Sequence, residues 1–185
     1  MDQPDWKNCQ VEELWQYVAW HLGEEGIESI LVGGAAANIY TEGECKTDHI
    51  DLALLDERAR NRVGAVMEGL EFVRSQERRF RHPECTHLFV DFPVGPMAAL
   101  GNDSSLNLVT KPVAGRVLKL LGPTDCVKDR LATYIHWRDR ECFAHAVQVC
   151  IWQDSVELRE LKNWCAREGA PTAFGELRKG IQEAE

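Results

Sequence analysis

The feature that most constrains the fold of this chain is a pair of glycines, Gly33 and Gly34, between two unlike segments. The apolar run SILV precedes them, and the alanine-rich stretch AAANIY follows them. The first predicts a short buried strand and the second a helix, so the glycines mark a tight strand-to-helix turn. Backbone N–H groups at such a turn can also approach an anion at the helix N-terminus. An ordinary tight turn and a phosphate site both remain open at this point.

Acidic residues are set into two strands that are otherwise apolar. The segment HIDLALL alternates, with His49 and Asp51 on its polar face. A later segment, HLFVDFP, places Asp91 in the same kind of position. If the two strands are neighbours, Asp51 and Asp91 project from one face and can share a divalent cation, because Mg²⁺ takes oxygen ligands and bridges to phosphates. Two solvated acids on an exposed sheet face are the alternative.

Periodicity along the rest of the chain predicts an α/β protein. We expect helices at residues 11–24, 34–40, 57–69, 124–137, 139–152 and 155–168, with a short one after Pro171. Gly and Pro residues predict a loop over residues 93–115, before a last strand in RVLKLLG. The expected fold is a small mixed sheet with helices on one face, followed by a helical C-terminal segment. Residues 1–122 would form the α/β core and residues 123–185 the helical segment packed on it, as one compact unit.

Charge limits the partners of this chain. It has 44% hydrophobic and 28% charged residues, as globular proteins do, with a formal net charge of -9. That charge excludes a chain-wide electrostatic hold on nucleic acid, but it allows a local basic patch. Four arginines lie close together in RSQERRFRH, namely Arg74, Arg78, Arg79 and Arg81. They predict either contact with the phosphate of a nucleotide or an RNA end, or a solvated edge strand protected by its charges.

The cysteines and the N-terminus predict a reduced, cytoplasmic protein without a membrane segment. The seven cysteines are odd in number and form no CxxC pair, so most are expected to be buried small hydrophobes. The start, MDQPDWKN, lacks a signal segment, and no apolar run approaches the ~20 residues of a membrane span. The cluster of His82, Cys85 and His87 lacks the second ligand pair of a structural zinc site. His87 is expected on the strand face of Asp91.

Four segments together resemble a known family. They are LVGGAAANIY, KTDHIDLALL, HLFVDFPVGP and GPTDCVKDRLATYIHWRDR, and they cover residues 31–140. This combination resembles the nucleotidyltransferase fold of the DNA polymerase beta superfamily. It is most similar to the small bacterial branch that includes toxin-like members of abortive-infection and toxin–antitoxin systems. The resemblance implies a metal-dependent enzyme that moves a nucleoside monophosphate from a nucleoside triphosphate to an acceptor, with Mg²⁺ or Mn²⁺ as cofactor.

The resemblance also assigns roles to individual positions. It implies that Gly33 and Gly34 hold triphosphate oxygens, that Asp51 is a metal ligand and that Asp91 is the third acid. It implies that Lys128 meets the phosphates, with Arg130 as a helper.

One position departs from the family pattern. Aligned without gaps, the family's first acid falls on His49. Asp48 could take its place if a β-bulge shifts the strand register by one residue. His49 could itself be a ligand of a softer metal such as Mn²⁺. The third interpretation is a degenerate site that transfers nothing.

Two classes of function therefore remain. The first is a nucleotidyltransferase acting on RNA or protein as a toxin, with a cognate antitoxin as its partner. The second is a catalytically degenerate protein of the same fold that binds a nucleotide or a protein partner. No membrane partner is expected from either.

Overall fold

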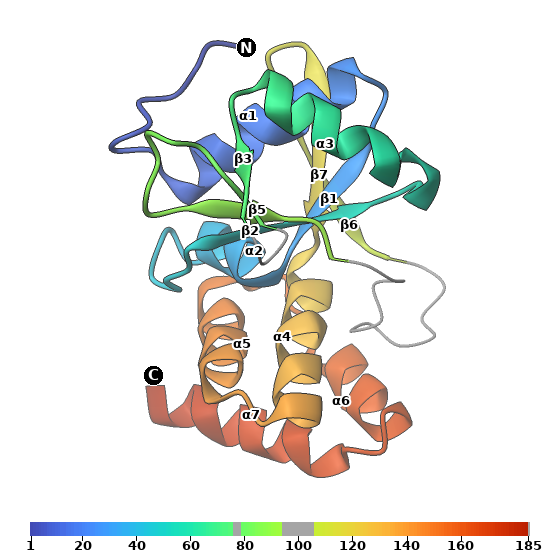
Figure 1. Ribbon diagram of the computed structural model, residues 1–185. Coiled ribbons are helices and arrows are strands. Elements are labelled where there is room, and N and C mark those ends of the chain that lie inside the picture. Colours follow the sequence, from blue (N-terminus) through green and yellow to red (C-terminus); the bar gives the residue numbers. More distant parts are fainter. Residues whose placement is uncertain (76–78, 94–105, 185) are drawn as a thin grey trace. The chain divides into compact units, whose positions relative to one another are not determined.

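The computed structural model describes residues 1–75, 79–93 and 106–184. These residues form a seven-stranded mixed sheet with the order β3-β4-β5-β2-β1-β7-β6 (Figure 1). The strands are β1 (Ser29–Val32), β2 (His49–Leu54), β3 (Val73–Arg74), β4 (Phe80–Arg81), β5 (Phe89–Asp91), β6 (Leu108–Val113) and β7 (Arg116–Leu121). β2 runs antiparallel to β1 and parallel to β5. The predicted mixed α/β fold is confirmed.

The chain divides into two compact units. The helices are α1 (Val11–Glu24), α2 (Gly33–Tyr40), α3 (Arg60–Gly69, after a 3-10 turn at Glu57–Ala59), α4 (Pro123–Trp137), α5 (Arg140–Trp152), α6 (Leu158–Arg167) and α7 (Pro171–Ala184). The first unit holds most of the sheet with α1 and α3. The second holds α4 to α7 together with Ala36–Lys46. The expected division at residue 122 stays a prediction.

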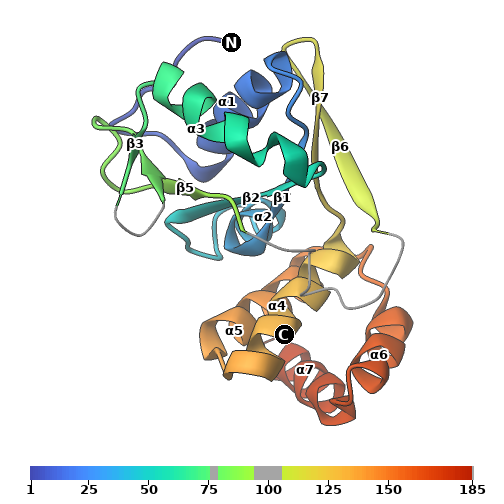
Figure 2. The ribbon, with the colours of Figure 1, turned by 45° about the vertical axis from the view of Figure 1, so that its right-hand side comes forward.

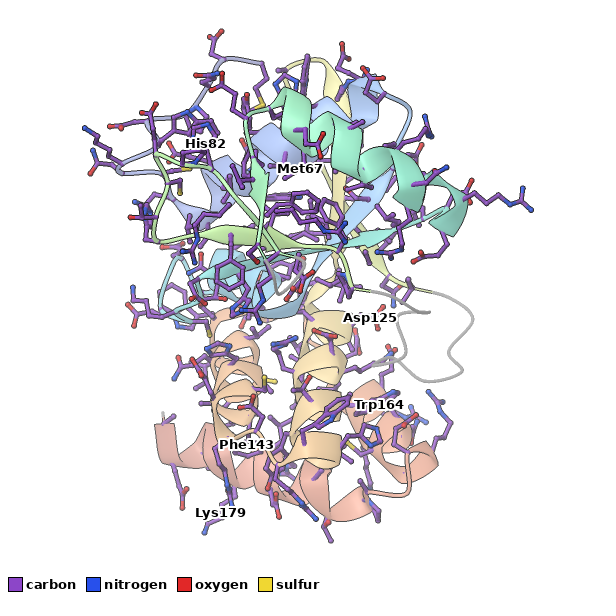
Figure 3. The ribbon with its side chains drawn as sticks, in the orientation of Figure 1. Met67, His82, Asp125, Phe143, Trp164 and Lys179 are labelled. Atoms are coloured by element: carbon purple, nitrogen blue, oxygen red, sulfur yellow. The ribbon has the colours of Figure 1, made fainter. Side chains whose placement is uncertain are left out.

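The core of the first unit lies between its helices and one face of the sheet. α1 and α3 lie side by side over that face (Figures 1 and 2). The apolar stripe of α1 is buried throughout, at Val11, Leu14, Trp15, Val18 and Leu22. Met67 of α3, labelled in Figure 3, is fully buried, as are Ile50 and Leu52 of β2. Burial of this apolar surface stabilises the layer pair, and it leaves the His49 and Asp51 face of β2 on the opposite side.

The prediction of a loop over residues 93–115 is wrong for the residues that form β6. Leu108–Val113 is a strand at the edge of the sheet, and a tight turn at Ala114 and Gly115 joins it to β7. Both turn residues have positive φ, +46° and +82°, as the favoured hairpin turns require. Pro112 predicted a loop because it lacks an N–H, but an edge strand has one side without a partner strand and tolerates proline. Residues 94–105 lie outside the described part of the chain.

The second unit is a helical bundle, as predicted. α4 and α5 pack along each other, and α7 packs against both α5 and α6. Trp164 of α6, labelled in Figure 3, is buried together with Leu161. Asp139 begins α5 by accepting hydrogen bonds from the backbone N–H groups of Glu141 and Cys142. In the described segments of the chain, no helix is both long and apolar enough to span a bilayer.

Replacing Ile50 by Ala should lower the free energy of unfolding by about 2–5 kcal/mol, because Ile50 is completely buried and truncation leaves a cavity. Val117 of β7 is 62% exposed, so Val117→Ala is the matched control and should cost less than about 1 kcal/mol. Urea unfolding followed by circular dichroism measures both. Equal losses in the two variants would contradict the assignment of the buried sheet face.

Candidate active site

The two predicted acids lie opposite each other on adjacent strands. β2 and β5 pair in parallel, with His49 beside Phe89, Ile50 beside Val90 and Asp51 beside Asp91. Residues paired in this way project from the same face of a sheet, so Asp51 and Asp91 share a face. The predicted placement of the two acids is confirmed, and their chemical role stays a prediction. The backbone at the end of β5 orients the carboxylate of Asp91, because its Oδ1 accepts a hydrogen bond from the N–H of Phe92 at 2.7 Å.

The glycine turn lies directly against Asp51. Gly33 has a φ of +73°, and a Cβ added there would lie 2.4 Å from Oδ2 of Asp51. A Cβ on Gly34 would lie 3.0 Å from Oγ1 of Thr47. Any side chain at Gly33 would therefore displace the carboxylate, and glycine is also the residue that takes this φ without strain. Thr47 was not among the predicted site residues. Its Oγ1 also accepts the backbone N–H of His49 at 3.2 Å, at the start of β2.

The structure adopts the gapless register at His49. Pairing between β2 and β5 runs without interruption from His49 to Asp51, so His49 and Asp51 share a face. Asp48 precedes the strand, and its Oδ1 lies 2.7 Å from Nδ1 of His49. The bulge that would carry Asp48 to the Asp51 face does not occur in this pairing. Within the described residues, no group of three or more His, Cys, Asp or Glu side chains is arranged to hold a metal ion.

Arg60, which the sequence did not single out, holds the end of β5. Its guanidinium donates hydrogen bonds to the carbonyls of Phe92 at 2.9 Å and Pro93 at 2.7 Å. It also pairs with Glu57 three residues earlier. The hydrogen bond to Glu57 raises the pKa of Arg60, burial opposes the rise, and the charge of Asp91 adds to it. In the sequence, Arg60 and Glu57 are indistinguishable from an exposed helical ion pair.

Lys128, in the second unit, is a buried cation held by carboxylates. Its ammonium lies 2.8 Å from Asp125 and 2.5 Å from Glu160, and the residue is 1% exposed. Burial disfavours the charged ammonium, but hydrogen bonds to Asp125 and Glu160 outweigh it and raise the pKa of Lys128. Asp125, labelled in Figure 3, also accepts the backbone N–H of Asn107 at 2.7 Å. A role of Lys128 toward phosphates stays a prediction.

Arg130 is held in a similar way two residues further along α4. Its guanidinium lies 2.6 Å from Asp129 and donates to Sγ of Cys142 at 3.3 Å. Burial opposes its charge, but the charge of Asp129 outweighs burial and raises the pKa of Arg130. Its predicted help in binding nucleotide remains a prediction.

The two histidines of the 82–87 cluster contact the N-terminal segment. The ring of His82 stacks on Trp6 at 3.7 Å between centroids, and Nε2 of His87 lies 2.9 Å from the carbonyl of Cys9. His87 precedes β5 and contacts this segment.

All seven cysteines are free thiols, and six of them are buried, as predicted. Burial raises the pKa of Cys9 to about 12, so this thiol is not a nucleophile at neutral pH.

Comparison with known proteins identifies the fold. The chain matches no protein-family model and no curated protein sequence. It is similar to the crystal structure of an antigenic nucleotidyltransferase-like protein from Paracoccidioides brasiliensis, with a TM-score of 0.58 and 18% identity over 91% of this chain and 94% of that chain. It is also similar to the solution structure of the antibiotic-resistance factor ANT(2'')-Ia, with a TM-score of 0.56 and 13% identity over 96% of this chain and 97% of that chain. The chain thus has a nucleotidyltransferase fold, and the predicted resemblance is confirmed at the level of the fold.

Gly33→Ala should disturb the site as well as the turn. Both Gly33 and Gly26 have positive φ, +73° and +68°, so alanine at either position costs about 1–2 kcal/mol of backbone strain. Gly26 has open space around its Cβ position, whereas Gly33 faces Asp51. Gly33→Ala should therefore lose about 1–3 kcal/mol more stability than the control, Gly26→Ala, because it overpacks the site. Urea unfolding of both variants measures the difference, and equal losses would contradict the close approach of Asp51.

Lys128→Ala should destabilise the protein by about 3–5 kcal/mol, because it leaves the buried carboxylate of Asp125 without its cation. Lys179→Ala is the control in the same unit. Lys179 is 75% exposed and forms a surface ion pair with Glu183, so its loss should cost less than about 0.5 kcal/mol. Adding Asp125→Asn to Lys128→Ala should recover part of the loss in thermal unfolding. No recovery would show that the loss does not come from the unpaired carboxylate.

Proposed function

We propose that this protein is a nucleotidyltransferase that binds a nucleoside triphosphate at the Asp51 and Asp91 face. The observation that carries the proposal is the side-by-side register of the two acids, with the Gly33 turn packed against one of them. Both similar structures support it, since one is that of a nucleotidyltransferase-like protein and the other is that of ANT(2'')-Ia. The strand-to-helix turn brings backbone N–H groups and a helix N-terminus to this face, where a triphosphate can be bound.

The residues of the site fit one divalent cation. Mg²⁺ is usually held by one or two carboxylates together with phosphate oxygens and waters, and Asp51 and Asp91 supply two such carboxylates from adjacent strands. His49 adds an imidazole, which suits Mn²⁺ better than Mg²⁺. When bound, the cation would neutralise charge on the phosphates.

The proposed reaction is an in-line displacement at the α-phosphorus. An oxygen of the acceptor forms a bond to this phosphorus, and the bond to the bridging oxygen of the β-phosphate breaks. Pyrophosphate leaves with the bonding electron pair, and the acceptor proton passes to a carboxylate of the site or to solvent. In this proposal Gly33 and Gly34 position the triphosphate.

A second function is supported by His49. Its imidazole replaces the first acid of the family pattern and is paired with Asp48. Only two carboxylates then remain on the face of β2 and β5 that the pairing defines. The alternative is therefore a catalytically degenerate protein that uses the same face to bind a nucleotide or a protein partner.

The biological role that we propose is that of a cytoplasmic toxin with an RNA or protein acceptor and a cognate antitoxin. It rests on the sequence resemblance to toxin-like nucleotidyltransferases. Induced expression in bacteria tests it, since growth arrest should depend on the site and disappear in Asp51→Asn. Growth arrest by both the parent protein and Asp51→Asn, or by neither, would contradict this role.

Transfer activity is the direct test of the first function. The purified protein is incubated with labelled nucleoside triphosphates and Mg²⁺ or Mn²⁺, and pyrophosphate release and label transfer are measured. Activity should fall by at least a hundredfold in Asp51→Asn and Asp91→Asn, since each removes an anionic metal ligand. Nucleotide binding without turnover would support the second function. Absence of both nucleotide binding and turnover would contradict both the nucleotidyltransferase activity and nucleotide binding by a degenerate site.

His49→Asp and Asp48→Ala separate the possible cation ligands. The register places His49 on the Asp51 face, so His49→Asp adds a third anionic oxygen ligand and should tighten Mg²⁺ binding by about tenfold. Asp48→Ala should leave Mg²⁺ affinity nearly unchanged, because Asp48 lies before the strand. Isothermal titration calorimetry with Mg²⁺ measures both against the parent protein. Loss of binding in Asp48→Ala would show that Asp48 is the ligand in solution.

A further inference from the structure

Two arginines extend the carboxylate face toward the edge of the sheet. β4 pairs with β5 through Phe80 beside Val90, so Phe80 lies on the buried face with Val90. Side chains alternate along a strand. Arg79 and Arg81, on either side of Phe80, therefore lie on the opposite face, which is the face of Asp51 and Asp91.

Contacts with Phe89 place these arginines beside the proposed active site. The guanidinium carbon of Arg79 lies 4.7 Å from the centroid of the Phe89 ring, and that of Arg81 lies 5.7 Å from it. The ring of His49 lies edge-on to the same phenylalanine ring, with 4.0 Å between the ring centroids and 74° between the ring planes. A continuous row thus runs over three adjacent strands, from the arginines through Phe89 and His49 to the two acids.

The arginines are suited to bind anions. Phe89 is 4% exposed, so its ring is a support under the guanidinium groups rather than a surface for a ligand. A guanidinium held over an aromatic ring loses less conformational freedom when it binds an anion. Arg81 is exposed and Arg79 is half-buried. In a chain of net charge -9, two cations beside a pair of carboxylates locally balance the negative charge.

We propose that Arg79 and Arg81 bind backbone phosphates of a single-stranded nucleic acid, whose end reaches the face of Asp51 and Asp91. Neighbouring strands lie about 4.8 Å apart, so the arginines at β4 are one strand from Asp91 on β5 and two strands, roughly 10 Å, from Asp51 on β2, which is near enough for the end of a bound strand to reach the acids. Phosphate contacts of this kind position a strand without selecting its sequence. That the bound end is the acceptor rests on the proposed function, whereas the binding itself does not require it.

Arg74 provides a matched control on the same hairpin. It pairs with Phe80 in the register of β3 and β4, and its guanidinium lies 5.7 Å from the Phe80 ring, on the other face of the sheet. Arg74→Gln and Arg81→Gln therefore change the charge equally on opposite faces. Arg81→Lys keeps the charge, and circular dichroism establishes that each variant is folded.

The experiment measures fluorescence anisotropy of a labelled 12-nucleotide RNA, and of the same sequence as DNA, over a salt series without nucleoside triphosphate. The slope of log K against log[salt] should fall by about 0.7 in Arg81→Gln and by about 1.4 in the double variant with Arg79→Gln, one step per lost phosphate contact. Affinity at low salt should fall about tenfold or more in the double variant. Arg74→Gln should match the parent protein, and Arg81→Lys should retain most of the slope.

Three results would overturn the proposal: no binding by the parent protein, equal weakening in Arg74→Gln and Arg81→Gln, or equally tight binding of poly-glutamate through the same arginines. The last would indicate an acidic protein partner instead. Affinity for nucleoside triphosphate with Mg²⁺ is measured separately in the same variants. Loss of nucleic acid binding with unchanged triphosphate affinity would support the arginine site, and absence of triphosphate binding in the parent protein would count against the proposed function alone.

Discussion

The register between β2 and β5 is the constraint on which the site depends. Side chains alternate along a strand, so a shift of one residue would move Asp51 into the apolar layer and Ile50 out of it. Complete burial of Ile50 and Leu52 fixes this register through the hydrophobic effect. The Gly33 turn then adds a local constraint, because its backbone approaches the Asp51 carboxylate more closely than any side chain would allow. The fold thus orients the acid from both its own strand and the preceding one.

The cations of α4 show how the second unit is held together. Lys128 and Arg130 each pair with a carboxylate in the same helix, Asp125 and Asp129 respectively. All four are largely buried, and such pairs are costly to break because the remaining charge would lose both partner and water. An aligned lysine in a family motif can therefore have a structural role as well as, or in place of, a role toward substrate. The contact with Glu160 on α6 depends on packing between helices, so spacing within α4 could not indicate it.

Local patterns predicted the elements better than they predicted the contacts. Alternation identified β2, and a 3.6-residue period identified α1, because each pattern reports burial of a single face. The β6 strand was missed since Pro112 is a loop signal unless the strand is known to be at an edge. The neighbour relation of Asp51 and Asp91 could be stated only as a condition, because strand order is not encoded by either strand alone. Arg60 and Thr47 were missed as site residues for the same reason, since their contacts join segments that are distant in the chain or in different elements.

Within the proposed function, a histidine instead of an acid at position 49 changes the negative charge that a bound cation has to neutralise. Two carboxylates carry two negative charges, which a single divalent cation neutralises, whereas a third acid at position 49 would favour a second cation. The pairing of His49 with Asp48 directs one ring nitrogen away from metal binding. A cation held by Asp51 and Asp91 alone would need further oxygen ligands, and the phosphates of a nucleotide supply them. Metal and nucleotide would then bind more tightly together than either does alone, and by linkage each would raise the affinity of the other to the same extent.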